Sequence, residues 1–256
     1  MKTLIAFTKK EFMEQRRSGK LLFLTILFVL FGIMNPAIAK LTPWLMEMFA
    51  DSLAQSGMTV TDVTVTAMDS WVQFFKNIPM ALIAFVLLES SIFTKEYQAG
   101  TLILSLTKGL PRKTVVISKA IILVVLWTIG YWLCFGITYG YNAYFWDNAI
   151  AQNLLFSCVC WWLFDLWILA LMILFSCLFA SGSGVLLGTG GVALGCYLLG
   201  LLPKISKYLP AKLTDGNPLI HGIAETRDYY PALIITGCLY IVCFLAGIAV
   251  FNKKQL

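Results

Sequence analysis

Long apolar stretches separated by shorter polar ones dominate the chain. Six windows approach the length of about 20 residues that a helix needs to cross the hydrocarbon core of a bilayer, which is roughly 30 Å thick. Because lipid offers the backbone no hydrogen-bond partners, we expect each window to form a helix. The predicted spans are residues 21–39, 78–93, 120–141, 154–180, 185–202 and 231–251.

The polar segment before the first span has the spacing of an amphipathic helix. We expect residues 1–20 to form an interfacial elbow helix that lies on anionic lipid, and the alternative is a solvated basic tail. One side of the helix carries Leu4, Ile5, Thr8 and Phe12. The other side carries Lys2, Lys10 and Arg17.

Two other segments interrupt the pattern of spans. Residues 42–77 predict two short helices outside the membrane, near 44–55 and 67–75. Residues 203–230 are rich in proline and glycine, which favours a broken connection, external or re-entrant, over another span. We therefore expect one all-α transmembrane domain that covers the whole chain (1–256).

Composition agrees with a membrane protein. Of the 256 residues, 59% are hydrophobic and 12% are charged, whereas a soluble domain carries about a quarter charged residues. A water-soluble fold could not bury this much apolar surface, and nothing in the sequence favours a nucleic-acid partner. The seven cysteines lie in apolar windows without a CxxC pair, so we expect small buried side chains rather than disulfides or metal ligands.

Basic residues predict the orientation in the membrane. Cytoplasmic segments carry an excess of lysine and arginine, and the segments before the first span and after the second are the richest in both. We expect both termini in the cytoplasm of a bacterial cell, with the chain in its plasma membrane. The basic residues on that side are Lys2, Lys9, Lys10, Arg16, Arg17, Lys20, Lys95, Lys108, Arg112, Lys113 and Lys119. The exceptions, placed outside by the alternation of spans, are Lys204, Lys207, Lys212 and Arg227.

Catalytic and nucleotide-binding motifs are missing from the sequence. No GxxxxGK[ST] phosphate-binding loop is present, and the glycine-rich run 182–195 contains no lysine. The motifs HExxH and GxSxG are also absent, and His221 is the single histidine. We therefore expect neither an enzyme nor a metal site, and no cofactor on this chain.

The cytoplasmic segment 94–119 carries more information than any other. We expect residues 95–106 to form a short helix directly after the second span, and Gly109 and Pro111 to turn the chain back into the membrane. Such a helix could transmit force from a cytosolic partner. A solvated basic loop is the alternative, and it leaves the leucines of the segment unexplained.

This segment resembles the E-x3-GT-L…P…K signature of type-2 ABC transporter permeases. The matching residues are Glu96, Gly100, Thr101, Pro111 and Lys119. The six-helix plan and the amphipathic N-terminal segment are similar to that family over nearly the whole chain. The resemblance implies that residues 95–106 act as a coupling helix. The residues to which it gives that role are Lys95, Glu96, Tyr97, Gly100, Thr101, Leu102, Leu106, Pro111 and Lys119.

The same resemblance implies partners and an activity. Two separate ATPase subunits would bind ATP and Mg, a second permease chain would complete a homodimer or heterodimer, and the assembly would work as an exporter. The apolar spans favour an amphipathic or hydrophobic cargo such as a peptide, a lipid or a drug over a polyanion. The alternatives are a self-sufficient ion-driven transporter or channel, and a membrane-embedded enzyme, for which the sequence offers too few clustered polar groups.

Two acids lie within the predicted spans, where ionisable groups are costly and often functional. Asp165 lies near the middle of the fourth span. It could hydrogen-bond a neighbouring helix, face water, stay protonated, or contact a substrate or ion. Glu89 lies within about a turn of the cytoplasmic surface, and we expect it to pair with Arg16, Arg17 or Lys20 rather than act in transport.

Small residues recur at four-residue spacing in the fifth span. Such spacing lets helix backbones approach closely in lipid. The family resemblance implies a place beside the dimer interface and the pathway, and tight packing inside one subunit is the alternative. The residues are Gly184, Gly188, Gly191 and Gly195.

Overall fold

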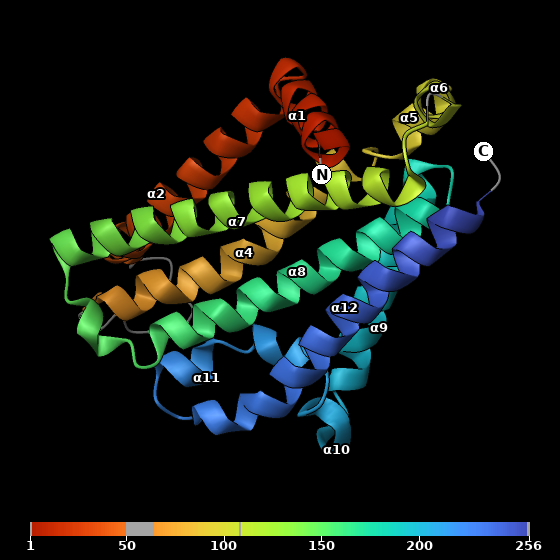
Figure 1. Cartoon of the computed structure of the whole chain (residues 1–256). Coiled ribbons are helices and arrows are strands. Elements are labelled where there is room, and N and C mark those ends of the chain that lie inside the picture. The colour runs from red at the N-terminus through yellow and green to blue at the C-terminus, as the bar shows by residue number, and fades with distance from the viewer. Residues whose placement is uncertain (1, 50–63, 108, 255–256) are drawn as a thin grey trace.

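A computed structural model describes residues 2–49, 64–107 and 109–254, and every regular element in these ranges is a helix (Figure 1). Six helices are long and apolar enough to cross a bilayer, which confirms the predicted six-span, all-α class. They are α2 (Lys20–Met48), α4 (Ala67–Glu89), α7 (Arg112–Phe145), α8 (Leu154–Leu178), α9 (Gly182–Gly200) and α12 (Tyr230–Lys253).

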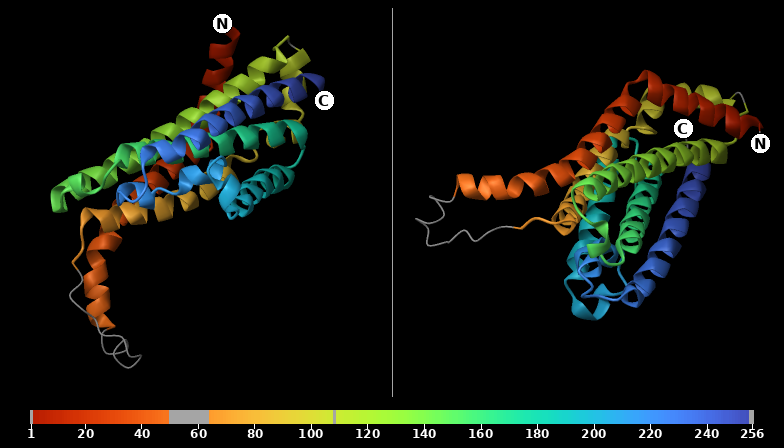
Figure 2. Two further views of the ribbon diagram at one scale, coloured as in Figure 1. Left: turned by 90° about the horizontal axis from the view of Figure 1, so that it is seen from below. Right: turned by 90° about the vertical axis from the view of Figure 1, so that its left-hand side faces the viewer.

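Shorter helices gather at the two ends of the bundle (Figures 1 and 2). One end, the α5 end, carries α1 (Lys2–Arg17), α5 (Thr94–Gln98), α6 (Thr101–Thr107) and the last turn of α12. The opposite end, the α11 end, carries the remaining short elements. They are α10 (Pro203–Ser206), α11 (Asn217–Ile220) and the 3₁₀ turns η1 (Asn148–Ile150), η2 (Pro210–Thr214) and η3 (Thr226–Tyr229).

Aromatic side chains form much of the contact between α2, α4 and α7. The Trp127 ring of α7 lies 5.4 Å from the Phe28 ring of α2 and 5.2 Å from the Phe85 ring of α4. A Cβ added at Gly130 would lie 2.2 Å from the Phe28 ring, so only glycine leaves room for that ring. Tight packing of rings against a glycine therefore sets the approach of α2 to α7.

A buried polar group satisfies the backbone of α2 at a proline. Pro36 has no N–H, so the Gly32 carbonyl one turn earlier lacks its helical donor. The Thr138 hydroxyl of α7 donates to that carbonyl at 3.1 Å. Asn35 donates to Thr138 at 3.0 Å and accepts from Asn77 of α4 at 2.7 Å, so three spans share one hydrogen-bonded group.

The two short helices predicted within residues 42–77 are not found as separate elements among the described residues. The prediction of a separate helix at 67–75 was wrong, because these residues form the start of α4, which continues through Pro79. Thr66 caps this start, accepting from Met68 N at 3.3 Å, while the Asp69 carboxylate accepts from Thr66 N at 2.9 Å. The helix expected at 44–55 is part of α2 as far as Met48, and its remainder lies outside the described residues.

The segment 203–230 folds as the broken connection that its prolines predict. Its short helices pack on α8, α9 and α12. Leu213, Leu219 and Tyr229 are fully buried, and the Tyr229 hydroxyl donates to Asp215 O at 2.6 Å. The segment is therefore a folded cap on the α11 end and not an additional span.

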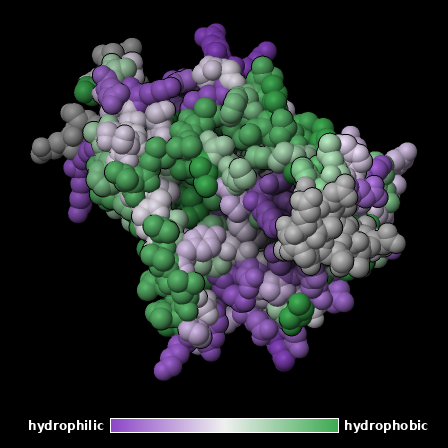
Figure 3. Space-filling view, turned by 180° about the vertical axis from the view of Figure 1, so that it is seen from behind, coloured by the Kyte–Doolittle hydropathy of each residue, from purple (hydrophilic) through white to green (hydrophobic). Residues whose placement is uncertain are grey.

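The outer surface of the bundle is apolar along its spans. In the view from behind, hydrophobic side chains cover a broad area across the upper part of the molecule and down one side, and hydrophilic ones lie above it and across the lower part (Figure 3). The least enclosed spans are α9 and α12, whose outward side chains include Leu187, Leu194, Ile234 and Val242. Such surfaces are suited to lipid or to another membrane-embedded chain.

Candidate functional site

A cluster of charged side chains joins three elements at the α5 end. The Lys119 ammonium of α7 lies 2.8 Å from a Glu11 oxygen of α1 and 2.9 Å from a Glu96 oxygen of α5. It also donates to the Ile92 carbonyl at 3.0 Å, in the turn before α5. Lys119 is 1% exposed, so its charge depends on these partners rather than on water.

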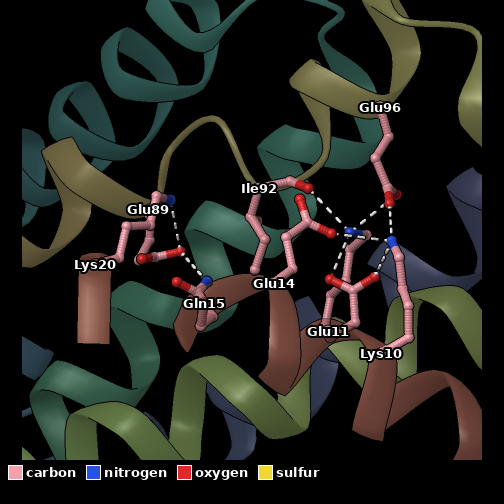
Figure 4. Close-up of polar contacts among 9 residues, drawn as sticks. Lys10, Glu11, Glu14, Gln15, Lys20, Glu89, Ile92 and Glu96 are labelled. Carbon is pink, nitrogen blue, oxygen red and sulfur yellow. Dashed lines mark hydrogen bonds and ion pairs between the residues drawn. The ribbon is translucent and has the colours of Figure 1, made fainter. Parts of the chain in front are cut away.

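Lys10 of α1 bridges the same acids from the side exposed to solvent (Figure 4). Its ammonium donates to Glu96 and lies 3.1 Å from both Glu11 and Glu14. Partial burial lowers the pKa of Lys10, but the hydrogen bond to Glu96 and the nearby carboxylate charges outweigh burial and hold that pKa above its ordinary value. Lys10 therefore stays charged across the physiological range.

A second ion pair joins α1, α2 and α4. The Lys20 ammonium lies 3.2 Å from a Glu89 oxygen, and the Gln15 amide donates to the same oxygen at 2.7 Å (Figure 4). Lys20 also donates to Leu88 O at 2.8 Å, next to the end of α4. Glu89 is fully buried. This geometry confirms the predicted pairing of Glu89 with Lys20.

The fully buried residues of α1 are polar, and several of its large apolar side chains are exposed beside its basic residues. Glu11 and Gln15 are its buried residues, while Ile5, Phe12 and Met13 are 65%, 44% and 42% exposed. A helix on the surface of a soluble protein has the opposite arrangement. The exposed apolar side is available to lipid, as an interfacial helix requires.

The expected coupling helix is two short helices with a break between them. Gly100 has φ +67°, a left-handed conformation that glycine adopts without strain, and it separates α5 from α6. Gly109 also has positive φ, and Pro111 precedes the first turn of α7 with φ −64°. The predicted turn back into the membrane is confirmed, with Pro111 as its last residue.

The residues that the signature singled out fall into two groups. Those on the surface can meet a partner, and those inside hold the segment on the bundle. Lys95 and Thr101 are exposed, and Gly100, Tyr97 and Leu106 are half-buried. Glu96, Leu102 and Lys119 are buried. Ile103 of α6, which the signature did not single out, is 44% exposed.

Contacts at the end of α12 join it to the end of α8 and to the start of α7, which sequence reasoning missed. Lys254 donates to Cys177 O at 2.9 Å and to Phe179 O at 3.3 Å, at the end of α8. Arg112 donates to Phe251 O at 3.2 Å and to Lys254 O. A cation at the C-terminus of a helix interacts favourably with the helix dipole and with the last carbonyl groups. The signal available in the sequence was the presence of basic residues directly after an apolar span.

The acids of the cluster do not form a convincing metal site. Carboxylate oxygens of Glu11, Glu14 and Glu96 lie within 4.8 Å of one another. Two ammonium groups, from Lys10 and Lys119, already contact these oxygens and supply the positive charge that a cation would bring. The arrangement is therefore suited to joining helices, not to holding an ion.

Asp165 lies apart from this cluster, inside the bundle. It is completely buried on α8, so it does not face water in this conformation. Neither carboxyl oxygen is within hydrogen-bond geometry of any described residue, and the nearby Trp127 indole N–H of α7 has no partner among them either. Asp165 is therefore buried without a cationic partner and without a hydrogen bond among the described residues. Its part in transport stays a prediction.

Of the four α9 glycines that the sequence singled out, two pack against side chains of the same chain, and the other two lie at its surface. A Cβ at Gly188 would lie 2.6 Å from the Phe175 ring, and one at Gly184 would lie 3.0 Å from the Phe179 side chain, so both pack inside the subunit. Gly191 and Gly195 have no neighbouring atom within 4 Å of such a Cβ. The second pair is therefore open to a lipid or to a further chain.

Six apolar spans and a helical segment held by ion pairs at one end are typical of the membrane component of a transporter. The chain belongs to the ABC-2 family transporter proteins, whose family model matches residues 5–235. It is also similar to an uncharacterized transmembrane protein, YxlG, of Bacillus subtilis (strain 168). The two are 24% identical over 261 aligned residues, which cover 100% of this chain and 98% of that relative.

Proposed function

We propose that this chain is the permease subunit of an ABC exporter in a bacterial plasma membrane, with the α5 end and both termini in the cytosol. Two ATPase subunits would bind ATP and Mg, and a second permease chain would complete the pathway. One observation carries the proposal. The segment α5–α6 projects at one end of the bundle and is joined by buried ion pairs to α1 and α7.

Surface residues of α5 and α6 supply the contact with the ATPase. Lys95, Thr101 and Ile103 are exposed there, and Ile103 is an apolar side chain at the end of the bundle that we place in the cytosol. Glu96 instead turns inward, so we assign it a positioning role rather than a contact. Closure of the ATPase would press on α5 and α6, and the ion pairs would pass that displacement to α1 and α7.

The second permease chain would lie against α9. This helix and α12 have the smallest enclosed share of the six spans, and Gly191 and Gly195 leave its surface open to close approach. The cargo would then pass beside α4 and α9. Apolar side chains along both helices favour an amphipathic or hydrophobic cargo, such as a peptide, lipid or drug.

The experiment is purification of the tagged full-length chain from its native membrane, followed by reconstitution in liposomes with the ATPase that accompanies it. An ATPase with a phosphate-binding loop should copurify, and ATP hydrolysis should depend on the permease. Ile103→Asp should remove most of the permease-dependent hydrolysis. Ile150→Asp is the matched control, because Ile150 is 48% exposed at the α11 end.

Two results would contradict the proposal. One is the recovery of a folded chain with no ATPase under any membrane-preserving condition, which would instead favour a self-sufficient transporter or channel. The other is equal loss of hydrolysis in the Ile103 and Ile150 variants, because the effect would then not belong to the α5–α6 surface.

A further inference from the structure

A hollow of about 620 Å³ lies at the α11 end, between the last turns of α7, the turn η1 and the first turn of α8. Its volume is in the range of small-molecule sites. Two hydrogen bonds hold η1 in place beside it. The Trp71 indole of α4 donates to Asn148 Oδ1 at 3.1 Å, and the Asn148 amide donates to Tyr139 O at 3.1 Å. The hollow is therefore part of the folded connection between α7 and α8.

The side chain that gives this hollow its charge is open to a ligand. Asp147 lines the hollow and is exposed, and its Oδ1 accepts from Ala149 N at 2.9 Å. No lysine or arginine lines the hollow, and no described cation forms an ion pair with Asp147. By contrast, Glu225 at the same end of the bundle lies 2.6 Å from Arg227. The hollow thus presents a carboxylate charge without a cation from the described part of the chain.

Aromatic rings form the walls around this acid. Phe135, Tyr139 and Trp146 line the hollow, and Tyr139 is 46% exposed. The face of an aromatic ring carries negative charge density and attracts cations. A neighbouring ring already does so, because the Lys40 ammonium lies 3.6 Å from the centre of the Phe145 ring, which is 5.7 Å from the centre of the Trp146 ring. The walls are therefore suited to a positively charged ligand.

We infer that this hollow binds the quaternary ammonium group of an amphiphilic organic cation. A primary ammonium has three N–H groups that need acceptors. The hollow offers few of them, since Asn148 Oδ1 and the Tyr139 carbonyl already accept hydrogen bonds. A quaternary ammonium has no N–H group, so rings and one carboxylate are sufficient to recognise it. An anion would be repelled by Asp147, and a neutral molecule would gain nothing from that charge.

The apolar chain of such a molecule has a surface to follow along α8. Leu154 and Leu155 line the hollow, and Leu155 is 61% exposed. Val159 is 36% exposed one turn further along the helix. Residues four apart lie on the same face of a helix, so Leu155 and Val159 form a continuous apolar strip. The ammonium would lie beside the aromatic rings at the membrane interface while the chain extends into the bilayer.

The inference goes beyond the proposed function and does not depend on it. No residue of α9, where we place the second permease chain, lines the hollow. Binding also needs no ATPase, so it can be measured on the isolated full-length chain. A failed binding test and a failed ATPase copurification are therefore separate results. The quaternary ammonium could belong to a free amphiphile or to the headgroup of a membrane lipid, and both present the same chemistry to the hollow.

The experiment is photolabelling of the full-length chain in dodecyl maltoside micelles, whose headgroups are uncharged. The probe is dodecyltrimethylammonium with a diazirine in its chain, and mass spectrometry locates the labelled residues. Label should appear around Trp146 and Leu155, and unlabelled dodecyltrimethylammonium should remove it. Dodecylammonium should compete more weakly, and dodecanoate should not compete. Added phosphatidylcholine distinguishes the two sources, because its competition identifies a lipid headgroup, and competition by the single-chain cation alone identifies a free amphiphile.

Matched variants test the charge and the rings separately. Asp147→Asn keeps an acceptor for Ala149 N and should weaken binding of dodecyltrimethylammonium by about 2- to 5-fold, the range for an exposed charge pair. Glu225→Gln removes an exposed charge outside the hollow and should leave binding unchanged. Tyr139→Leu should weaken binding by about 2- to 30-fold, the range for a cation on an aromatic ring. Its control is Tyr144→Leu, because Tyr144 is 82% exposed on α7 and does not line the hollow.

Three results would overturn the inference. The first is equal competition by dodecanoate and dodecyltrimethylammonium, which would show that charge is not recognised. The second is equal competition by dodecylammonium, which would remove the preference for a quaternary group. The third is unchanged binding in both Asp147→Asn and Tyr139→Leu. The Tm of each variant is measured alongside, and Asp147→Asn decides the result if Tyr139→Leu does not fold.

Discussion

Lys119 connects three separate parts of the α5 end through one ammonium group. Its partners are Glu11 of α1, Glu96 of α5 and the carbonyl of Ile92. A buried ion pair adds little net stability over an apolar pair of the same shape, but removal of one member leaves the other charge buried. The structural value of Lys119 is therefore specificity, since it holds α5 at one position on α1 and α7.

Lys119→Met should loosen α5 and α1 from the bundle, because Glu11 and Glu96 both lose their buried cation and keep only the half-exposed Lys10. The expected destabilisation is about 3 to 5 kcal/mol, the range for breaking a buried pair. It is measured as a lower Tm of the purified chain together with loss of permease-dependent ATP hydrolysis. Lys113→Met on the exposed face of α7 is the control and should change neither. An unchanged Tm in Lys119→Met would show that the cluster does not brace the segment.

Removal of the charge at Asp165 should not lower the Tm, in contrast to its removal at Lys119. The carboxyl is fully buried, and no described cation contacts it. Asp165→Asn keeps the size of the side chain and removes the possibility of an uncompensated charge, so we expect an equal or higher Tm. Asp165→Ala should lower the Tm, because it leaves a cavity beside Trp127. If Asp165→Asn unfolds the chain, an unseen partner stabilises the carboxylate. If it folds but no longer transports, the charge itself has a role in transport.

At the scale of elements, the break between α5 and α6 shapes the surface offered to the ATPase. Gly100 makes this break with φ +67°, a conformation that costs other residues about 1 to 2 kcal/mol. None of the described residues would obstruct a Cβ there, so the cost comes from the backbone conformation. A straight helix through this position would move Ile103 and Thr101 to a different face.

Gly100→Ala should therefore reduce coupling more than it reduces stability. We expect the variant to fold and to copurify with its ATPase, while permease-dependent hydrolysis falls several-fold. Gly136→Ala is the control, because Gly136 lies within α7 with open space around its Cβ position. Equal hydrolysis in the two variants would show that the break is dispensable.

The helices were largely predictable from sequence, and most contacts between them, apart from the pair of Glu89 with Lys20, were not. Hydropathy located six spans, and Gly109 with Pro111 marked the turn before α7. Hydropathy could not show that 67–75 continues into the span, because a proline at position 79 is tolerated inside a membrane helix. The signature named Glu96 and Lys119, but Glu11, the second acid that pairs with Lys119, lies far away in the sequence, and only the fold brings the three together.

At the scale of the whole molecule, the side of the membrane to which each end belongs remains a prediction. Most of the basic residues flanking the spans belong to the α5 end, which favours the cytosol. The α11 end carries Lys204, Lys207, Lys212 and Arg227. It nevertheless lies on the opposite side, because five spans, an odd number, separate this segment from the N-terminal one. Two of these four lie beside acids, with Lys212 at 3.1 Å from Asp215 and Arg227 at 2.6 Å from Glu225. The cap is thus a folded unit with internal charge pairs, unlike the open basic segments that normally fix orientation.

Labelling of single cysteines by a membrane-impermeant maleimide in intact cells tests this orientation. The background is Cys238→Ser, because Cys238 is the exposed native cysteine among the seven, all of which are described. Ile223→Cys should react in intact cells, since Ile223 is 81% exposed at the α11 end. Gln98→Cys on the exposed side of α5 should react only after permeabilisation. The reverse pattern would place the α5 end outside, where no ATP-driven partner could reach it, and would therefore remove the basis for coupling as well as the orientation.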